Sequence, residues 1–260
     1  MLIDIGVNLT SGQFATDHLQ VVERAKKAGV EKLIITGTNI PESVQAEQMA
    51  SQQPDCLYST AGIHPHHAKE FDQDSIRTLS DLLEKEQVVA VGECGLDYNR
   101  NFSEPADQRR CFSAQLELAA EKNRPAFLHQ RDAHEDFVKL LSEYLPQIPA
   151  AVAHCFTGTV NEMQQYIEMG LYIGITGWIC DERRGQKLKS IVNKIPPERL
   201  MLETDAPYLL PRDLQPKPKS RRNEPMYLPH IAEVVADCYG FSFNEIKKVT
   251  VENSQRFFSL

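Results

Sequence analysis

Eight short apolar or β-branched runs recur along the chain, and longer polar segments separate them. The runs cover residues 2–9, 32–38, 57–64, 88–97, 125–131, 150–156, 171–177 and 200–207. The intervening segments have helical periodicity, which places related side chains on one face of a helix. One such face holds Phe112, Gln115, Leu116 and Ala119, and another holds Leu228, Ile231, Val235 and Cys238. The pattern predicts strands that alternate with helices.

Alternating strands and helices predict a parallel sheet, and near-continuous apolar strands are typical of a sheet that helices cover. Eight such units in 260 residues match the usual size of a closed (β/α)8 TIM barrel. The alternative is an open doubly wound sheet, which normally carries a Gly-rich phosphate turn after its first strand. The first run ends in Gly6-Val7-Asn8, which is no such turn. No repeat, low-complexity tract or linker divides the chain, so we expect one domain over residues 1–260.

The composition is that of an ordinary globular protein, with 42% hydrophobic and 25% charged residues. A net charge of -8 disfavours a general nucleic-acid-coating protein. It does not exclude a nuclease, because a bound divalent cation dominates the field of its own cleft. Six scattered cysteines without a CxxC pair predict reduced thiols. Without a basic leader or a long apolar run, we expect a cytoplasmic protein that does not enter the membrane.

Four potential metal ligands lie at or near the ends of separate runs: Glu93, His129, His154 and Asp205. In a barrel of this type, the residues at the carboxyl ends of the strands converge on the catalytic face. A buried carboxylate such as Glu93 is costly unless a positive group meets it. A nitrogen and oxygen ligand set suits Zn, Mn, Fe or Co, whereas Mg relies mainly on carboxylates. The pattern predicts a metal site; the alternative is a set of buried, hydrogen-bonded side chains without metal.

Further residues are candidates for binding a substrate at the same face. His64 lies near the end of the third run, and Arg131 follows His129 by two residues, on the same side of its strand. Arg131 is placed to contact a phosphate; the alternative is a salt bridge with Asp132 or with an acidic residue of a loop.

Residues 211–224 form a proline-rich segment that carries a local net charge of +3 and includes Arg221 and Arg222. Such a segment suits a phosphate backbone; the alternative is a solvated loop. Aromatic residues near the same face can stack unpaired bases. They are Trp178, Tyr98, Phe102, Phe156 and Tyr208.

Five sequence blocks together resemble the signature of the TatD family of metal-dependent nucleases. They are Gly92-Glu93-Cys94-Gly95-Leu96-Asp97, Leu128-His129-Gln130-Arg131-Asp132-Ala133, His154-Cys155-Phe156-Thr157-Gly158, Glu203-Thr204-Asp205-Ala206-Pro207-Tyr208-Leu209 and Arg222-Asn223-Glu224-Pro225. The resemblance implies an amidohydrolase-like barrel and a magnesium-dependent 3'-5' exonuclease of single-stranded DNA and RNA, linked to DNA repair. It also implies that Glu93, His129, His154 and Asp205 ligate the metal, with Mn²⁺ or Zn²⁺ as other candidates.

One position departs from the family pattern. Most members carry a His-x-His pair on the first strand, where this chain has Gly6 and Asn8. Glycine offers no side-chain ligand and asparagine only a neutral oxygen, so we expect one tightly held ion rather than two.

These residues predict a mechanism in which a metal-activated water attacks phosphorus. Glu93, His129 and His154 would hold the ion, with Asp205 as the proton acceptor. The alternatives are a small-molecule or aminoacyl-ester hydrolase of the amidohydrolase type, and a metal-depleted binding protein. The four candidate ligands argue against the last of these, and the basic segment favours a phosphate substrate. We expect a monomer.

Overall fold

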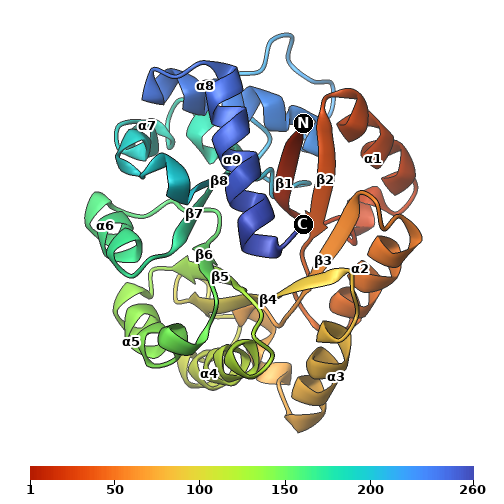
Figure 1. The fold of residues 1–260 in the computed structure, drawn as a ribbon, viewed down its shortest axis with the longest axis vertical. Coiled ribbons are helices and arrows are strands. Elements are labelled where there is room, and N and C mark those ends of the chain that lie inside the picture. The colour runs from red at the N-terminus through yellow and green to blue at the C-terminus, as the bar shows by residue number, and fades with distance from the viewer. The chain divides into compact units, whose positions relative to one another are not determined.

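The computed structural model describes residues 1–260, and its eight strands form one sheet in the order β1 to β8 (Figure 1). The strands are β1 (Leu2–Val7), β2 (Val30–Ile35), β3 (Leu57–Ala61), β4 (Val88–Asp97), β5 (Ala126–Arg131), β6 (Ala151–Ala153), β7 (Tyr172–Ile175) and β8 (Leu200–Leu202). Helical segments follow every strand. This strand order with helical connections confirms the predicted (β/α)8 barrel.

The α-helices are α1 (His18–Lys27), α2 (Ile40–Gln52), α3 (Gln73–Leu83), α4 (Pro105–Glu121), α5 (His134–Tyr144), α6 (Val160–Glu168), α7 (Gln186–Lys189), α8 (Leu228–Tyr239) and α9 (Phe243–Phe258). Short 3-10 helices fill several connections: η1 (Gly12–Phe14), η2 (Pro65–Glu70), η3 (Leu145–Gln147), η4 (Gly177–Cys180), η5 (Val192–Lys194), η6 (Pro197–Arg199) and η7 (Pro225–Tyr227). None of the helices combines the length and the hydrophobicity needed to span a bilayer.

The predicted runs reach beyond most of the strands on their carboxyl side. β3 ends at Ala61, β6 at Ala153 and β8 at Leu202, so His64, His154 and Asp205 belong to the loops that follow. By contrast, β4 continues to Asp97, and Glu93 therefore lies inside this strand and not at its end. Every residue of β4 is buried, as expected for a strand of a helix-covered parallel sheet.

The chain divides into two compact units. The first comprises Met1–Ile34, Cys155–Ile167 and Tyr172–Leu260, and the second comprises Ile35–His154 and Glu168–Leu171. The prediction of a single domain over residues 1–260 stays a prediction.

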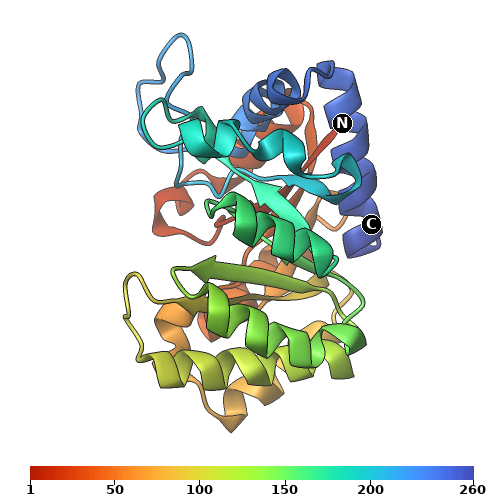
Figure 2. The ribbon, with the colours of Figure 1, turned by 90° about the vertical axis from the view of Figure 1, so that its left-hand side faces the viewer.

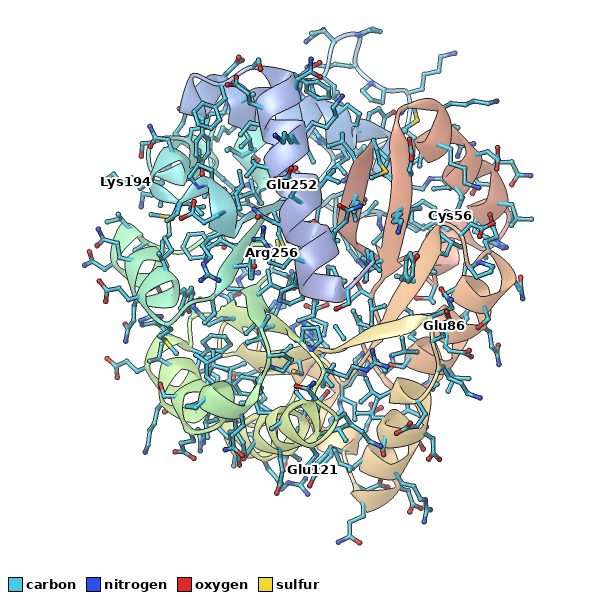
Figure 3. The ribbon with its side chains drawn as sticks, viewed as in Figure 1. Cys56, Glu86, Glu121, Lys194, Glu252 and Arg256 are labelled. Carbon is cyan, nitrogen blue, oxygen red and sulfur yellow. The ribbon has the colours of Figure 1, made fainter.

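In the first unit, the last helix of the chain packs against its first strand. Figure 1 shows α9 beside β8 and β1, and both strands contact the helix. The Nδ2 atom of Asn253 on α9 donates hydrogen bonds to the carbonyls of Leu200 and Pro197, each at 2.8 Å. Glu252 and Arg256 are exposed on the same helix (Figure 3). The amphipathic α9 therefore fixes the amino-terminal end of β8.

In the second unit, α4 and α5 lie side by side (Figure 2), and the rings of Phe112 and Phe137 stack with centroids 5.4 Å apart. The predicted α4 face of Phe112, Gln115, Leu116 and Ala119 is entirely buried, which confirms it. The side chain of Gln115 also forms two hydrogen bonds: it accepts one from the amide of Ile63 and donates one to the carbonyl of Ile63. Helix α4 thus fixes the backbone next to His64. The predicted α8 face is buried at Leu228, Ile231 and Val235, and Cys238 is half-buried.

Candidate metal centre

Three imidazoles converge on one carboxylate oxygen within the second unit. The Oε1 atom of Glu93 lies 2.7 Å from Nε2 of His154, 3.0 Å from Nδ1 of His129 and 3.3 Å from Nε2 of His64. All four side chains are buried or nearly so. The structure therefore brings together three of the four predicted ligands and adds the predicted substrate-binding residue His64.

The close approach of β4 and β5 depends on two glycines that flank Glu93. Gly92 and Gly95 have φ angles of +128° and +148°, in the region that favours glycine. A Cβ atom would lie 2.2 Å from the carbonyl oxygen of Phe127 at Gly92, and 1.8 Å from that of His129 at Gly95. The β4–β5 register also shifts between residues 91 and 94. These glycines let Glu93 and His129 meet.

His64 is oriented by its own backbone surroundings. Its amide donates to the carbonyl of Thr38 at 2.8 Å, and its Nδ1 atom accepts from the amide of His66 at 3.1 Å. Because Nδ1 accepts a hydrogen bond, the proton of neutral His64 is on Nε2. The Nε2 atom therefore acts as a donor toward Glu93, a role that fits the binding of an anionic oxygen better than metal ligation.

The donor set fits a divalent cation. A carboxylate oxygen offers about two lone-pair positions, so three imidazole nitrogens exceed what Oε1 of Glu93 can satisfy by hydrogen bonding. The Nε2 atom of His129 is also buried without a hydrogen-bond partner, because Oδ2 of Asp97 lies 3.6 Å away. One carboxylate oxygen with the nitrogens of His129 and His154 is a ligand set that Mn²⁺, Fe²⁺, Co²⁺ or Zn²⁺ accepts. These donor atoms are also close together, since Nδ1 of His129 and Nε2 of His154 lie 3.0 Å and 2.7 Å from Oε1 of Glu93.

Charge at the site follows from this geometry. Burial alone would raise the pKa of Glu93, but His154, His64 and His129 together hold it well below its usual value. Burial lowers the pKa of His64 to about 4, which leaves its imidazole neutral at pH 7. Burial also acts to lower the pKa of His129, but the nearby carboxylates of Asp97 and Glu93 outweigh it and raise that pKa. The site therefore contains an ionised carboxylate and attracts positive charge.

Sequence reasoning missed the roles of Asp97 and His66. The Oδ2 atom of Asp97 lies 2.8 Å from Nε2 of His66, and its Oδ1 atom accepts from the amides of Asn99 and Arg100. Asp97 is 1% exposed. Burial alone would raise its pKa, but the nearby imidazoles of His129 and His66 and the amide of Arg100 hold the pKa below the usual value. Strand alternation was the available signal, because residues 93, 95 and 97 point to one side of β4.

The fourth predicted ligand, Asp205, lies in the first unit, where the first strand positions it. Its amide donates to the carbonyl of Gly6 at 2.9 Å, and its Oδ1 atom accepts from Nδ2 of Asn8, also at 2.9 Å. Asp205 has a φ angle of +53°, so the backbone turns there directly after β8. Asn8, which stands where the sequence resemblance implies a ligating histidine, therefore orients a carboxylate in this chain.

The predicted phosphate-binding arginines differ in their surroundings. Arg131 and Arg221 are exposed, and neither side chain forms a hydrogen bond or an ion pair. The alternative salt bridge between Arg131 and Asp132 is absent. Arg222 instead donates to Asp17 at 2.8 Å, to Glu224 at 2.7 Å and to the carbonyl of Gln13. Its guanidinium is occupied by this network, which ties residues 211–224 to the start of α1.

The candidate aromatic residues differ in how much of each ring is exposed for stacking. Trp178 is half-buried at η4, and the guanidinium of Arg184 lies 4.2 Å from the centroid of its ring, covering one face. Phe102 is 55% exposed and its ring contacts that of His66, with centroids 4.8 Å apart. Tyr208 is 53% exposed. Phe102 and Tyr208 therefore offer more surface for stacking than the predicted Trp178.

Comparisons with known proteins agree with this architecture and with the sequence blocks. The family model described as TatD related DNase matches residues 3–259. A protein from Erwinia tasmaniensis named 3'-5' ssDNA/RNA exonuclease TatD is 56% identical over 259 residues, covering 100% of both chains. The crystal structure of a TatD homolog from Escherichia coli superposes with a TM-score of 0.90 at 27% identity, covering 100% of this chain and 98% of that one. A hydrolase TatD family protein from Entamoeba histolytica gives a TM-score of 0.90 at 29% identity, covering 99% and 97%. The chain belongs to the family of TatD related DNases.

Proposed function

We propose that this protein is a metal-dependent 3'-5' exonuclease that hydrolyses phosphodiester bonds of single-stranded DNA and RNA. The observation that carries the proposal is the convergence of three imidazoles on Oε1 of Glu93 in a chain 56% identical to a relative with that named activity. A net charge of -8 repels a nucleic acid overall. Substrate binding therefore depends on local positive groups, namely a bound cation and exposed arginines.

Glu93, His129 and His154 are the residues that would hold the ion. A divalent cation there would acidify a water and neutralise charge on the phosphoryl oxygens. Mg²⁺ is the ion that the family resemblance implies, whereas the two imidazole nitrogens favour tighter binding of Mn²⁺ or Zn²⁺.

The chain's own residues supply the remaining tasks. Asp205, held by Asn8, accepts a proton from the attacking water. His64 donates from Nε2 to an anionic oxygen, and Arg131 and Arg221 bind phosphates of the strand. Phe102 and Tyr208 stack unpaired bases, each stack contributing about 1–3 kcal/mol. A duplex end is a poorer substrate, because its bases must first unstack. A role in DNA repair, a cytoplasmic location and a monomeric state stay predictions.

The test uses the full chain after chelation, with single-stranded DNA and RNA labelled at either end. With added Mg²⁺ or Mn²⁺ we expect the 3'-labelled strand to release labelled mononucleotide first, and the 5'-labelled strand to shorten progressively. Excess chelator should stop both reactions. Internal cleavage, or undiminished cleavage in chelator, would contradict the proposal. Turnover of an aminoacyl ester without turnover of either strand would support the small-molecule alternative instead.

A further inference from the structure

A second cluster of potential ligands lies in the first unit and contains sulfur. The donor atoms of Cys180, Asp213 and His230 all lie within 4.8 Å of one another. The Nε2 atom of His230 is 2.7 Å from Oδ1 of Asp213, and the thiol of Cys180 lies close to the same carboxylate. Cys180 ends η4, Asp213 lies in the loop after β8, and His230 lies in the first turn of α8. Three separate segments therefore meet at one point.

The surrounding contacts hold these segments in place without help from the cluster. The carboxylate of Asp181 accepts from the amides of Arg183 and Arg184, and it pairs with the guanidinium of Arg212 at 3.3 Å. This pair joins the residue after Cys180 to the residue before Asp213. Helix α8 also packs against η4. The positions of the three donors are therefore set by neighbours on all three segments.

We propose that Cys180, Asp213 and His230 form a second metal site that takes Zn²⁺ and fastens the basic loop of residues 211–224 to η4 and α8. A thiolate, an imidazole and a carboxylate form a ligand set that zinc and cobalt accept, and a water completes four-coordination. Mg²⁺ is excluded by the sulfur, because that ion requires oxygen ligands.

The distances allow this with small side-chain movements. Metal–ligand bonds of about 2.0–2.3 Å place tetrahedral ligands roughly 3.3–3.8 Å apart. The contact between His230 and Asp213 must therefore lengthen from 2.7 Å. The side chains of His230 and Asp213 are 26% and 34% exposed, which gives them room to turn and gives the ion a path from solvent. Cys180 is 1% exposed, so its thiol is protonated without metal and releases its proton to solvent when the ion binds.

Cobalt distinguishes this site from the one around Glu93, because only Cys180 supplies a thiolate ligand. After chelation, one equivalent of Co²⁺ beyond the Glu93 site should produce sulfur-to-cobalt charge-transfer absorption in the near ultraviolet, and Zn²⁺ should remove it. Cys180→Ser should abolish the absorption and lower zinc content by one ion per chain. Glu93→Gln and Cys155→Ser, which removes the thiol beside His154, should keep it. Absence of the absorption in the wild-type protein, or its persistence in Cys180→Ser, would overturn the proposal.

A second variant tests the site independently, in case Cys180→Ser does not fold. His230→Gln keeps the thiol and retains a side chain that can donate to Asp213. It should weaken Co²⁺ binding at least about tenfold, as loss of a ligand or of its support typically does. It should also remove the thermal stabilisation that Zn²⁺ gives to the wild-type protein. Equal Co²⁺ affinity in both proteins would mean that the three residues form only a hydrogen-bonded network. Exonuclease activity is not needed for either readout.

Discussion

The Nδ2 atom of Asn8 donates to Oδ1 of Asp205 across 2.9 Å and joins two residues that are 197 positions apart. In this contact the amide presents its nitrogen, not its oxygen, to the carboxylate. Asn8 therefore orients Asp205 through its side-chain nitrogen. Because Gly6 contributes only its backbone carbonyl, the first strand supports Asp205 but supplies no metal-binding side chain.

Introducing the histidine pair that the sequence resemblance implies should therefore add a metal ion. We expect the Gly6→His/Asn8→His variant to hold one more Mn²⁺ or Zn²⁺ per chain than the wild-type protein, because imidazole ligates these ions and glycine does not. Elemental analysis after chelation and reloading measures the difference. Asn8→Gln, which keeps an amide, is the control. Equal metal content in all three proteins would argue that the first strand takes no part in metal binding.

Glu93→Gln should reduce exonuclease activity by about 100-fold or more, because it removes the negative charge on which three imidazoles converge. The variant should also need more Mn²⁺ for half-maximal activity. Its matched control is Glu86→Gln, an exposed acid that precedes β4 (Figure 3). Activity assays over a range of Mn²⁺ concentration, with thermal melts, separate lost chemistry from lost folding. Wild-type activity in Glu93→Gln would remove this residue from the site.

The sequence predicted the barrel because eight largely apolar strands recur at regular intervals, and this recurrence can be recognised even where the predicted ends of a strand are wrong. It also predicted that Glu93, His129 and His154 would meet, since residues near the strands' carboxyl ends converge. The tautomer of His64 could not be predicted from the sequence, because it depends on the hydrogen bond from the amide of His66. The ion pair between Arg222 and Asp17 could not be predicted either, since the two residues are 205 positions apart. Local pattern carries no information on such contacts.

Substitutions of the neighbouring residues Arg221 and Arg222 should have different effects. We expect Arg221→Ala to lower the slope of log K against log salt for single-strand binding by roughly 0.7, with an unchanged melting temperature. Arg222→Ala should instead destabilise the fold by about 1–3 kcal/mol, because it leaves Asp17 and Glu224 with fewer charged partners. Binding titrations at several salt concentrations and urea unfolding measure the two effects. The reverse assignment would show that Arg222 leaves its network to bind the strand.

Asp4 predicts a pH dependence of stability. It is fully buried on β1 and accepts from the amide and hydroxyl of Thr204, and burial raises its pKa from 3.8 to about 8. In the unfolded chain this carboxyl loses its proton near the ordinary pKa of 3.8, whereas the folded protein keeps the proton up to about pH 8. The free energy of unfolding therefore falls as pH rises from 3.8 toward 8.

Asp4→Asn cannot ionise, and its side-chain oxygen can still accept the hydrogen bond from the amide of Thr204. Its stability relative to the wild-type protein should therefore increase between about pH 5 and about pH 8, by an amount on the order of several kcal/mol. Urea unfolding at both pH values tests this, with the exposed Asp55→Asn as the control. A difference that stays constant with pH would mean that Asp4 is already ionised in the folded protein.

The packing of α9 against β1 has a consequence for how the protein is made. Residues 1–34 belong to the same compact unit as residues 172–260, whereas residues 35–154 form a continuous stretch of the other unit. On the ribosome, the first strand therefore emerges long before its α9 partner exists. At roughly 5–20 residues per second, it waits on the order of ten to fifty seconds. During that interval the middle of the chain can fold, while the amino terminus remains available to chaperones.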